Sequence, residues 1–536
     1  MRNSLILCAI ASAAHAFKIP FLDFLSFGSS HAVSSDVVPR KIAIIGAGAA
    51  GSSAAFWISK AKTASGVVVD VDVYEREGYI GGRSTVVYPY NDTTLPPLEL
   101  GASIFVQANK NLWRAASEFN LVKNNLTEDD ESEVGFWDGE KFVFTMGPSK
   151  GMFNWWNSIK VAWRYGISSP KKTQDIVKGM IKDILTIYSP ESPRWRNVTQ
   201  LVYELGWTDF LTQTTSEYLD LKGIQRRFSR EVVEAATRVN YGQNVDEIHA
   251  LEGACSLAAN GASNIKGGNF QIFENFLRRS GATFRANTLV KVISQLDNGK
   301  WTVRTSSGDV EVYDDVIIAA PFHSTGIKLM PYSAAAPIAV IPPQPYVHLH
   351  VTLLTTPTPR PNPDYFSLPP NSAIPRTVLT TNEGVRSGGQ EPEFNSLSYH
   401  GSMIDGRDEY IVKIFSKHNI SDEWLEKVYG KVGWVYRKEW DAYPKLPPTT
   451  KFPPVHLAPG LYYVNAFEPF ISTMETETVA SRNVVDMLFQ DHFGTGICGK
   501  PRNVENNSHP EYTEQTVFRQ PQQARSDDDF VLGFDC

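Results

Sequence analysis

The feature that most constrains this chain is a glycine-rich turn at residues 46–51, which read GAGAAG. An apolar run precedes the turn and a run of small residues follows it, so segment 41–60 predicts a strand, a tight turn and a helix. A second, β-branched strand then ends at Glu75, 24 residues after Gly51. In such a unit the helix N-terminus faces a pyrophosphate and the acidic residue accepts hydrogen bonds from a ribose. The alternative is a glycine-rich turn that binds nothing. The residues that this unit assigns to a dinucleotide are Gly46, Gly48, Ala49, Gly51 and Glu75.

The segments that follow Glu75 favour flavin over nicotinamide. Paired glycines precede Arg83, and residues 98–103 read LELGAS. This ordered set resembles the extended signature of FAD enzymes of the amine oxidase and phytoene desaturase families. The resemblance implies that the paired glycines and Arg83 pass close to the diphosphate and that segment 98–103 runs beside the flavin. It assigns to the cofactor Arg76, Gly82, Arg83, Gly101, Ala102 and Ser103, and we add Val290 from the strand-rich segment 282–320.

A third segment lies near the C-terminus, where residues 460–468 read GLYYVNAFE and a helix is predicted soon after. It resembles the closing FAD segment of the same superfamily, in which a strand returns to the nucleotide domain and a helix N-terminus faces the flavin ring. The resemblance adds Glu468, Met474 and Glu475 to the cofactor site. Because this segment contains no cysteine, we expect FAD to be bound non-covalently.

A narrower resemblance rests on residues 238–243, which read RVNYGQ, and on residues 266–269, which read KGGN. Together with the glycine motifs, they resemble the prenylcysteine oxidase (farnesylcysteine lyase) family over roughly residues 41–490. The resemblance implies an FAD-dependent thioether oxidase that uses O2 and water to convert S-farnesyl- or S-geranylgeranyl-cysteine to prenal, cysteine and hydrogen peroxide. The alternatives are an amine or terpenoid oxidase on the same scaffold, and a non-catalytic protein that keeps a vestigial nucleotide fold.

Candidate catalytic residues come from the same two strings. Tyr241 and Gln243 are expected either to line the substrate site or simply to pack, and Lys266 is a candidate for a position near flavin N5. His348 and His350 lie on one face of a predicted strand, but the sequence offers no evident third ligand, so we interpret them as structural and predict no metal site.

The fold class expected is α/β, with a Rossmann-type FAD-binding domain and an interleaved substrate domain of mixed sheet plus helices. The boundaries expected are a signal peptide (1–16), a lead-in (17–40), FAD-binding parts (41–106, 241–330 and 446–493), a mainly helical substrate region (107–240), a substrate-domain sheet (331–445) and an irregular or disordered tail (494–536).

Charge argues against a nucleic-acid partner, because the net charge is -7 and phosphate binding needs clustered basic residues. The aromatic segment 152–166 has two interpretations. Its apolar residues either pack as core or form a hydrophobic channel or membrane-facing entrance for an isoprenoid, with interleaved lysines and arginines that suit a peripheral membrane contact. These apolar residues are Trp155, Trp156, Ile159, Val161 and Trp163.

The N-terminus and the cysteines indicate the secretory pathway. A short apolar run after Arg2 ends in Ala14-His15-Ala16, which predicts a cleaved signal peptide; the alternative is a membrane anchor, for which the run is too short. We therefore expect a lysosomal, vacuolar or extracellular protein. Glycosylation acceptors are expected at Asn91, Asn125, Asn197, Asn419 and Asn506. Outside the signal there are three cysteines, which suggest a Cys498–Cys536 bridge that holds the tail and a buried thiol at Cys255.

Overall fold

The computed structural model of the protein describes residues 38–126, 133–147, 152–259, 261–403, 406–499 and 530–536. The expected signal peptide, most of the lead-in and the acceptor Asn506 lie outside the described residues, as do the side chains of Trp155 and Trp156. One compact unit, Pro39–Cys536, contains the described helices and strands.

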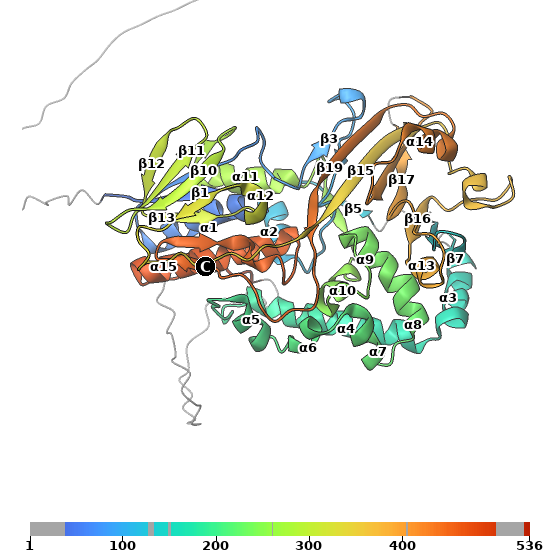
Figure 1. Ribbon diagram of the computed structural model, residues 1–536, viewed down its shortest axis with the longest axis horizontal. Coiled ribbons are helices and arrows are strands. Elements are labelled where there is room, and N and C mark those ends of the chain that lie inside the picture. The colour runs from blue at the N-terminus through green and yellow to red at the C-terminus, as the bar shows by residue number, and fades with distance from the viewer. Residues whose placement is uncertain (1–37, 127–132, 148–151, 260, 404–405, 500–529) are drawn as a thin grey trace, which may run out of the picture. The chain divides into compact units, whose positions relative to one another are not determined.

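A six-stranded sheet of order β20-β21-β13-β1-β2-β9 is the centre of the nucleotide-binding part (Figure 1). Its neighbours pair in parallel except β20, which is antiparallel to β21. Ile42, Ala43 and Ile44 of β1 are fully buried, because a parallel sheet is covered on both faces and its strands read as continuous apolar runs. The strands are β1 (Arg40–Ile45), β2 (Val69–Tyr74), β9 (Thr283–Arg285), β13 (Asp315–Ile318), β20 (His456–Ala458) and β21 (Leu461–Tyr463).

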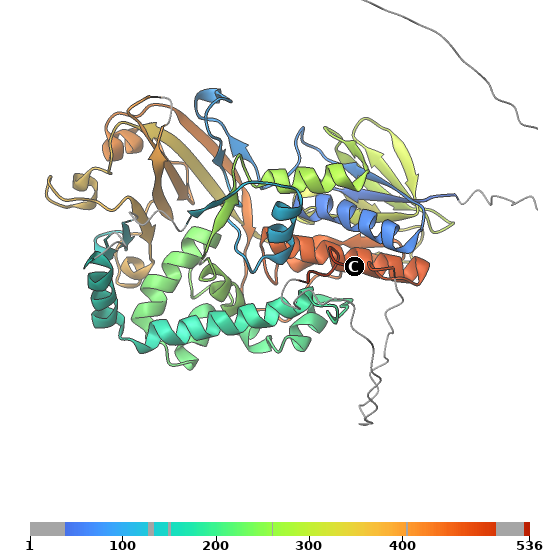
Figure 2. The same cartoon turned by 180° about the vertical axis from the view of Figure 1, so that it is seen from behind.

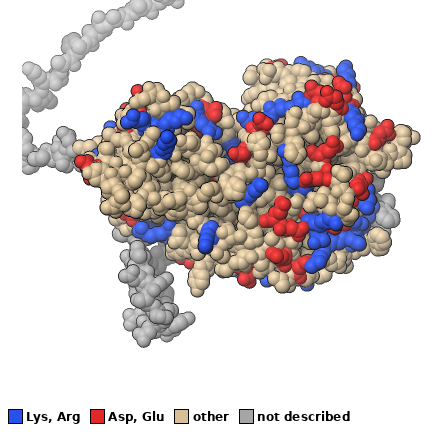
Figure 3. Space-filling model, in the orientation of Figure 1, with Lys and Arg blue, Asp and Glu red and all other residues tan. Residues whose placement is uncertain are grey.

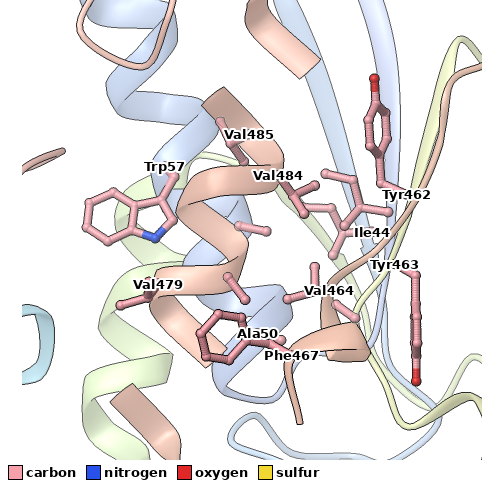
Figure 4. Packing of buried hydrophobic residues seen from close by; sticks show 14 of the residues in the cluster. Ile44, Ala50, Trp57, Tyr462, Tyr463, Val464, Phe467, Val479, Val484 and Val485 are labelled. Carbon is pink, nitrogen blue, oxygen red and sulfur yellow. The ribbon is translucent and has the colours of Figure 1, made fainter. Parts of the chain in front are cut away.

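Helix α1 (Ala49–Ser65) packs against both α11 (Phe270–Ser280) and α15 (Met474–Phe493). Small residues at the start of α1 allow this close approach, and the indole N–H of Trp57 donates to the carbonyl of Thr478 at 3.0 Å. Figure 4 shows side chains of α1 and α15 meeting strand residues such as Ile44 in one apolar core. Residues 421 positions apart are thus held together, which explains why the C-terminal segment completes the nucleotide-binding part.

A seven-stranded sheet of order β19-β15-β18-β17-β16-β6-β7 forms the substrate domain. All neighbours are antiparallel except β16 and β6. The region 107–240, expected to be mainly helical, contributes β6 and β7 to this sheet before its long helices begin, because β6 pairs with a strand far along the chain. The strands are β6 (Val134–Trp137), β7 (Phe142–Met146), β15 (Tyr346–Thr356), β16 (Thr377–Thr380), β17 (Ser396–Ser402), β18 (Tyr410–Ser416) and β19 (Val435–Pro444).

The helices between β7 and β8 extend from beside this sheet to the nucleotide-binding part, whose core includes Val198 and Leu211 (Figures 1 and 2). They are α3 (Met152–Tyr165), α4 (Ser168–Leu185), α5 (Val198–Glu204), α6 (Thr208–Thr212), α7 (Thr215–Leu221), α8 (Arg226–Phe228), α9 (Glu234–Tyr241) and α10 (Ala250–Ser256).

A four-stranded sheet comprises β12 (Val310–Tyr313), β11 (Trp301–Thr305), β10 (Val290–Gln295) and β14 (Lys328–Met330). The smaller elements are α2 (Lys110–Glu118), α12 (Phe322–Thr325), α13 (Glu383–Arg386), α14 (Asp422–Tyr429) and the pairs β3 (Val86–Val87) with β4 (Leu98–Glu99) and β5 (Lys123–Asn125) with β8 (Ser263–Ile265). The expected α/β class with an interleaved substrate domain is confirmed.

The tail was expected to be irregular or disordered, and its described end, residues 530–536, is irregular but packed against the fold. Although it has no regular secondary structure, Phe534 packs edge-on against Trp57 with ring centroids 5.0 Å apart. Arg482 of α15 donates to the carbonyl of Leu532 at 3.1 Å. The expected bridge between Cys498 and Cys536 is confirmed. Apolar burial and the disulfide therefore fix the C-terminus on the nucleotide-binding part.

Neither interpretation of the aromatic segment, as core or as a hydrophobic entrance, accounts for all of the described side chains of α3. Val161 packs against a buried cluster, whereas Ile159 is 38% exposed and Trp163 is 87% exposed. Within the described residues, no helix is long and apolar enough to cross a membrane. On the face shown in Figure 3, basic and acidic side chains are interspersed.

Candidate cofactor and substrate cavity

A cavity of about 1040 Å³ lies between the nucleotide-binding part and the substrate-domain sheet. Its wall includes the glycine turn after β1, the segments around Arg83 and Gly101, the N-terminus of α15, and side chains of α4, β17, β18 and β19. A volume of this size takes a large ligand, since the pockets that bind drug-sized molecules measure roughly 300–1,000 Å³.

The glycine turn brings backbone close to this cavity. A Cβ on Gly51 would lie 1.8 Å from the carbonyl oxygen of Gly46, so only glycine lets α1 begin against the turn. A Cβ on Gly82, whose φ is +59°, would lie 3.2 Å from the Cα of Gly48. The α1 N-terminus, with its positive dipole end, therefore opens onto the cavity beside two backbone segments, which suits a pyrophosphate.

Glu75 is buried at the end of β2 and lines the cavity. Its carboxylate accepts hydrogen bonds from the backbone N–H of Ala47 at 2.8 Å and from that of Glu77 at 2.9 Å. These bonds fix the carboxylate, and its remaining lone pairs can accept from ribose hydroxyls. Arg76 and Val290 also line the cavity.

Arg83, Glu468 and Glu477 form a charged group in the cavity wall. Arg83 donates to Glu468 and also to the carbonyl of Ala442 at 2.9 Å, and Tyr346 donates to Glu468 from the other side. Although burial opposes its charge, the neighbouring Glu468 raises the pKa of Arg83. Burial, and then the charge of Glu468, raise the pKa of Glu477 well above its usual value.

The polar residues of the wall fit an FAD. Two buried side-chain oxygens in this wall, Oε1 of Glu477 and Oδ1 of Asn465, have no partner among the described residues. Such buried polar atoms are costly unless a ligand bonds to them, and the hydroxyls of a ribityl chain can both donate and accept. With the Gly46–Ala50 turn and Glu75 for the pyrophosphate and ribose, the set matches the chemistry of FAD along its length.

The other predicted cofactor residues Gly101, Ala102, Ser103, Met474 and Glu475 also line the cavity. Glu475, however, is engaged by the protein itself. Its two oxygens accept from the backbone N–H groups of Asn111 at 2.8 Å and Leu112 at 2.9 Å, in the first turn of α2, and the Tyr188 hydroxyl donates to it at 2.7 Å. We therefore infer that Glu475 fixes the N-terminus of α2 and the side chain of Tyr188 at the cavity wall.

The three catalytic candidates, Tyr241, Gln243 and Lys266, lie in different environments. Tyr241 lines the cavity and packs edge-on against Tyr443 with centroids 5.8 Å apart. Gln243 is not in the cavity wall; its amide donates to the carbonyl of Pro444 at 3.0 Å and accepts from the N–H of Leu446 at 2.8 Å, which fixes the end of β19. Lys266 is exposed and also lies outside the wall. Of the two roles left open for Gln243, its contacts fit packing, and neither Gln243 nor Lys266 is among the residues of the cavity wall.

Sequence reasoning missed a polar group on the substrate-domain sheet. Ser396, Ser398 and His400 of β17 and Lys413 of β18 line the cavity. The available signal was a lysine inside the otherwise apolar strand YIVKIF at residues 410–415, and alternating polar residues at 396, 398 and 400.

A third potential metal ligand was also missed. Glu439 of β19 lies opposite His350 of β15, and one ligand atom each from His348, His350 and Glu439 lie within 4.8 Å of one another. This carboxylate is far from the histidines in sequence, so only strand pairing reveals it.

Much of the remaining wall is apolar. Side chains from α4, from the loop after β4 and from neighbouring helices contribute to it; they include Ile104, Phe105, Leu112, Met180, Ile181 and Ile184. The cavity thus joins nucleotide-binding segments to a largely apolar chamber that also has polar residues in its wall.

Comparison with known proteins agrees with this geometry. The family model of prenylcysteine lyase matches residues 149–495, more than half of the chain. The chain belongs to the prenylcysteine lyase family. A model of NAD(P)-binding Rossmann-like domains matches residues 44–119. The resemblance to this family that the sequence motifs indicated is confirmed.

Relatives in the family extend over most of the chain. The chain is 29% identical to farnesylcysteine lyase of Arabidopsis thaliana over 475 residues, which cover 86% of this chain and 90% of the relative. It is also 29% identical to prenylcysteine oxidase 1 of Homo sapiens over 474 residues, which cover 84% of this chain and 89% of the relative.

Solved structures share the fold. A redesigned putrescine oxidase aligns with a TM-score of 0.54 at 14% identity and covers 84% of this chain and 99% of its own. Cyclohexylamine oxidase from Brevibacterium oxydans aligns with a TM-score of 0.52 at 13% identity and covers 83% of this chain and 97% of its own. At these identities the likeness establishes the two-part architecture alone.

Proposed function

We propose that the protein is an FAD-dependent thioether oxidase that cleaves S-prenyl-L-cysteine to prenal and cysteine, with O2 reduced to hydrogen peroxide. The observation that carries this proposal is the cavity in which an FAD-type wall, with Glu75 and Arg83, continues into an apolar chamber formed partly by α4. The family relatives from Arabidopsis thaliana and Homo sapiens are named for farnesylcysteine and prenylcysteine.

The reaction balances without a metal. The carbon between sulfur and the allylic double bond loses two electrons and one C–H bond, water supplies the aldehyde oxygen, and the C–S bond breaks to release the cysteine thiol. Bound FAD would supply the two-electron chemistry and pass the electrons to O2. The protein's own contribution is to place the reacting carbon and to limit the access of water through the apolar side chains of Met180, Ile181 and Ile184.

The test is anaerobic mixing of the flavin-bound protein with S-farnesyl-L-cysteine. We expect the visible absorbance of the flavin to bleach, and aldehyde and hydrogen peroxide to appear in equal amounts once air is admitted. S-dodecyl-L-cysteine, which lacks the allylic carbon, is the matched control and should leave the flavin oxidised. If the flavin stays oxidised with the farnesyl compound and instead bleaches with an amine or a terpenoid, the proposed substrate is wrong.

We also propose that the protein passes through the secretory pathway to a lysosome, a vacuole or the cell exterior. The four acceptor asparagines among the described residues, Asn91, Asn125, Asn197 and Asn419, are all exposed. The Cys498–Cys536 disulfide suits an oxidising compartment. Treatment of the protein from its natural cells with an endoglycosidase should lower its apparent mass, and an unchanged mass together with a cytosolic location would contradict the proposal.

A peripheral contact with an anionic membrane is proposed for α3. Ile159 and Trp163 lie four residues apart on α3 and are exposed, and Ile167, in the turn that follows α3, is 77% exposed; the nearby Lys160 and Lys171 are also exposed. An apolar helix face flanked by lysines suits the headgroup region of an anionic bilayer. Co-sedimentation with vesicles containing phosphatidylserine should fall in a Trp163→Glu variant and persist in a Tyr203→Glu variant, since Tyr203 is 82% exposed on a different helix. Equal sedimentation of both variants would refute the contact.

A further inference from the structure

A polar patch on the substrate-domain sheet faces the cavity. Ser398 of β17 and Lys413 of β18 are direct cross-strand partners, so their side chains emerge on the same face of the sheet. Ser103, from the segment after β4, meets them there, because the ammonium of Lys413 donates to its hydroxyl at 3.1 Å. All three residues line the cavity.

The Lys413 ammonium is buried and forms no close ion pair among the described residues, although, against the lowering effect of burial, the nearby carboxyl of Glu99 raises its pKa. The residue is 9% exposed, and within that part of the chain its only other hydrogen bond goes to the backbone carbonyl of Glu99 at 2.7 Å. An ammonium has three N–H donors, so one of them has no hydrogen-bond acceptor among the residues that the structure describes, although the ring of Phe415 faces the ammonium with its centroid 4.8 Å from Nζ. A buried cation of this kind is stable only when an anion or other acceptor compensates it.

The neighbouring titratable groups do not supply that anion at mildly acidic pH. Burial raises the pKa of Glu99 to about 7, so below that pH its carboxyl is mainly neutral. His400, which also lines the cavity, has its pKa lowered to about 4 by burial and by Lys413, so it too is neutral. Burial lowers the pKa of Lys413 only to about 8, so the ammonium keeps its charge. The patch is therefore a positive spot in an apolar chamber.

We propose that Lys413, with the hydroxyls of Ser103 and Ser398, binds the α-carboxylate of the cysteine part of the substrate. This inference rests on the proposed function and deepens it, because it requires a substrate with a free carboxylate. The unused N–H of Lys413 and the two hydroxyls supply donors suited to a carboxylate, while the apolar wall receives the prenyl chain. Holding the carboxylate at one fixed point sets the position of the sulfur and the carbon next to it.

The experiment measures binding without turnover. S-dodecyl-L-cysteine and its methyl ester, both below their critical micelle concentrations, are titrated calorimetrically into flavin-bound protein at about pH 6. The ester differs from the acid mainly by the missing negative charge. We expect the acid to bind at least about 10-fold more tightly than the ester to the natural protein, since charge-assisted hydrogen bonds are worth about 1.5–3 kcal/mol.

The matched variants are Lys413→Gln and Lys431→Gln, the second of which alters an exposed lysine of the same domain. Lys413→Gln should lose about 10-fold in affinity for the acid and leave the affinity for the ester unchanged, while Lys431→Gln should resemble the natural protein. An unchanged acid-to-ester ratio in Lys413→Gln overturns the inference. If that variant does not fold with flavin, Ser398→Ala replaces it. We then expect the affinity for the acid alone to fall about 3-fold, as loss of one neutral hydrogen bond predicts. An equal loss of affinity for acid and ester overturns the inference.

Failure here is distinguishable from failure of the proposed function. If farnesyl-cysteine reduces the flavin but the acid-to-ester ratio is independent of Lys413, only the carboxylate site is wrong. If the ratio depends on Lys413 but farnesyl-cysteine leaves the flavin oxidised, the carboxylate site stands and the thioether oxidation does not.

Discussion

Arg83 and Glu468, 385 residues apart in the chain, form an ion pair in the wall of the cofactor cavity. Glu468 is 1% exposed, and Arg83 also donates to the carbonyl of Ala442 in β19. One guanidinium therefore joins the N-terminal FAD segment, the closing FAD segment and the substrate-domain sheet. The pair links the closure of the nucleotide site to the position of the substrate site.

Removal of the charge from Glu468 tests that link. A Glu468→Gln variant leaves the Arg83 guanidinium without its nearest counter-charge, and loss of one member of a buried pair costs about 3 kcal/mol. We expect the free energy of unfolding to fall by about that amount and the protein to be purified with little flavin. Glu426→Gln, which changes an exposed carboxylate, is the control and should keep both. Full flavin content in Glu468→Gln would show that the pair is dispensable for the site.

The glycine turn makes a separate prediction. In a Gly51→Ala variant the new Cβ would lie 1.8 Å from the carbonyl oxygen of Gly46, so α1 must shift away from the turn. Overpacking of this kind costs roughly 1–3 kcal/mol, and the shift moves the helix N-terminus off the pyrophosphate position. We expect flavin content to fall several-fold, measured from the absorbance ratio of flavin to protein.

The control for that variant is Gly179→Ala in α4. A Cβ there meets nothing within 4 Å, and the residue is exposed within the helix. Replacing a helical glycine by alanine typically stabilises by about 0.5–1 kcal/mol, so this variant should keep its flavin and unfold at a slightly higher temperature. Equal flavin contents in the two variants would contradict the role given to Gly51.

The sequence predicts the cofactor half of the site better than the substrate half. Gly46, Glu75 and Arg83 were predictable because local motifs place them, and a strand-turn-helix unit fixes their geometry within a short stretch. The role of Lys413 was not predictable, because it depends on contacts with Ser103 and Glu99. These residues lie about 310 positions away in the sequence and come near Lys413 only in the folded protein. For Gln243 the sequence left substrate lining and packing open, because a motif does not show which of its side chains reach a cavity and which bond to neighbouring strands.

The apolar chamber gives a prediction on chain length. Ile184 of α4 lines the cavity, and a tryptophan there would occupy space that the distal isoprene units require. Each buried methylene contributes about 0.8 kcal/mol, so loss of part of one isoprene unit should raise KM for the geranylgeranyl substrate about 10-fold or more. The KM for a geranyl substrate should change little. Lys178→Trp, on the exposed side of the same helix, controls for the added ring, and a uniform rise in KM for both chain lengths would contradict this placement.

Glu252 gives a pH dependence of stability. It is fully buried in α10, accepts from the N–H of Ser472 at 3.1 Å, and burial raises its pKa to about 8. An unfolded glutamate titrates near 4.3, so between that pH and about 8 the folded protein holds a proton that the unfolded chain has lost. The stability that Glu252 contributes is therefore fully present below the unfolded pKa and is lost as pH rises through 8, by up to about 1.4 kcal/mol per pH unit.

A Glu252→Gln variant keeps the acceptor for Ser472 and removes the titration. Urea unfolding at about pH 5 and about pH 8 should show the natural protein losing stability relative to the variant by a few kcal/mol between the two conditions. His249, whose pKa burial lowers to about 4, acts in the opposite direction below neutral pH, but it is present in both proteins and cancels in the difference. A difference in unfolding free energy that stays constant between the two pH values would show that Glu252 is ionised in the folded state. In that case the buried carboxylate must have a cationic partner that offsets its desolvation.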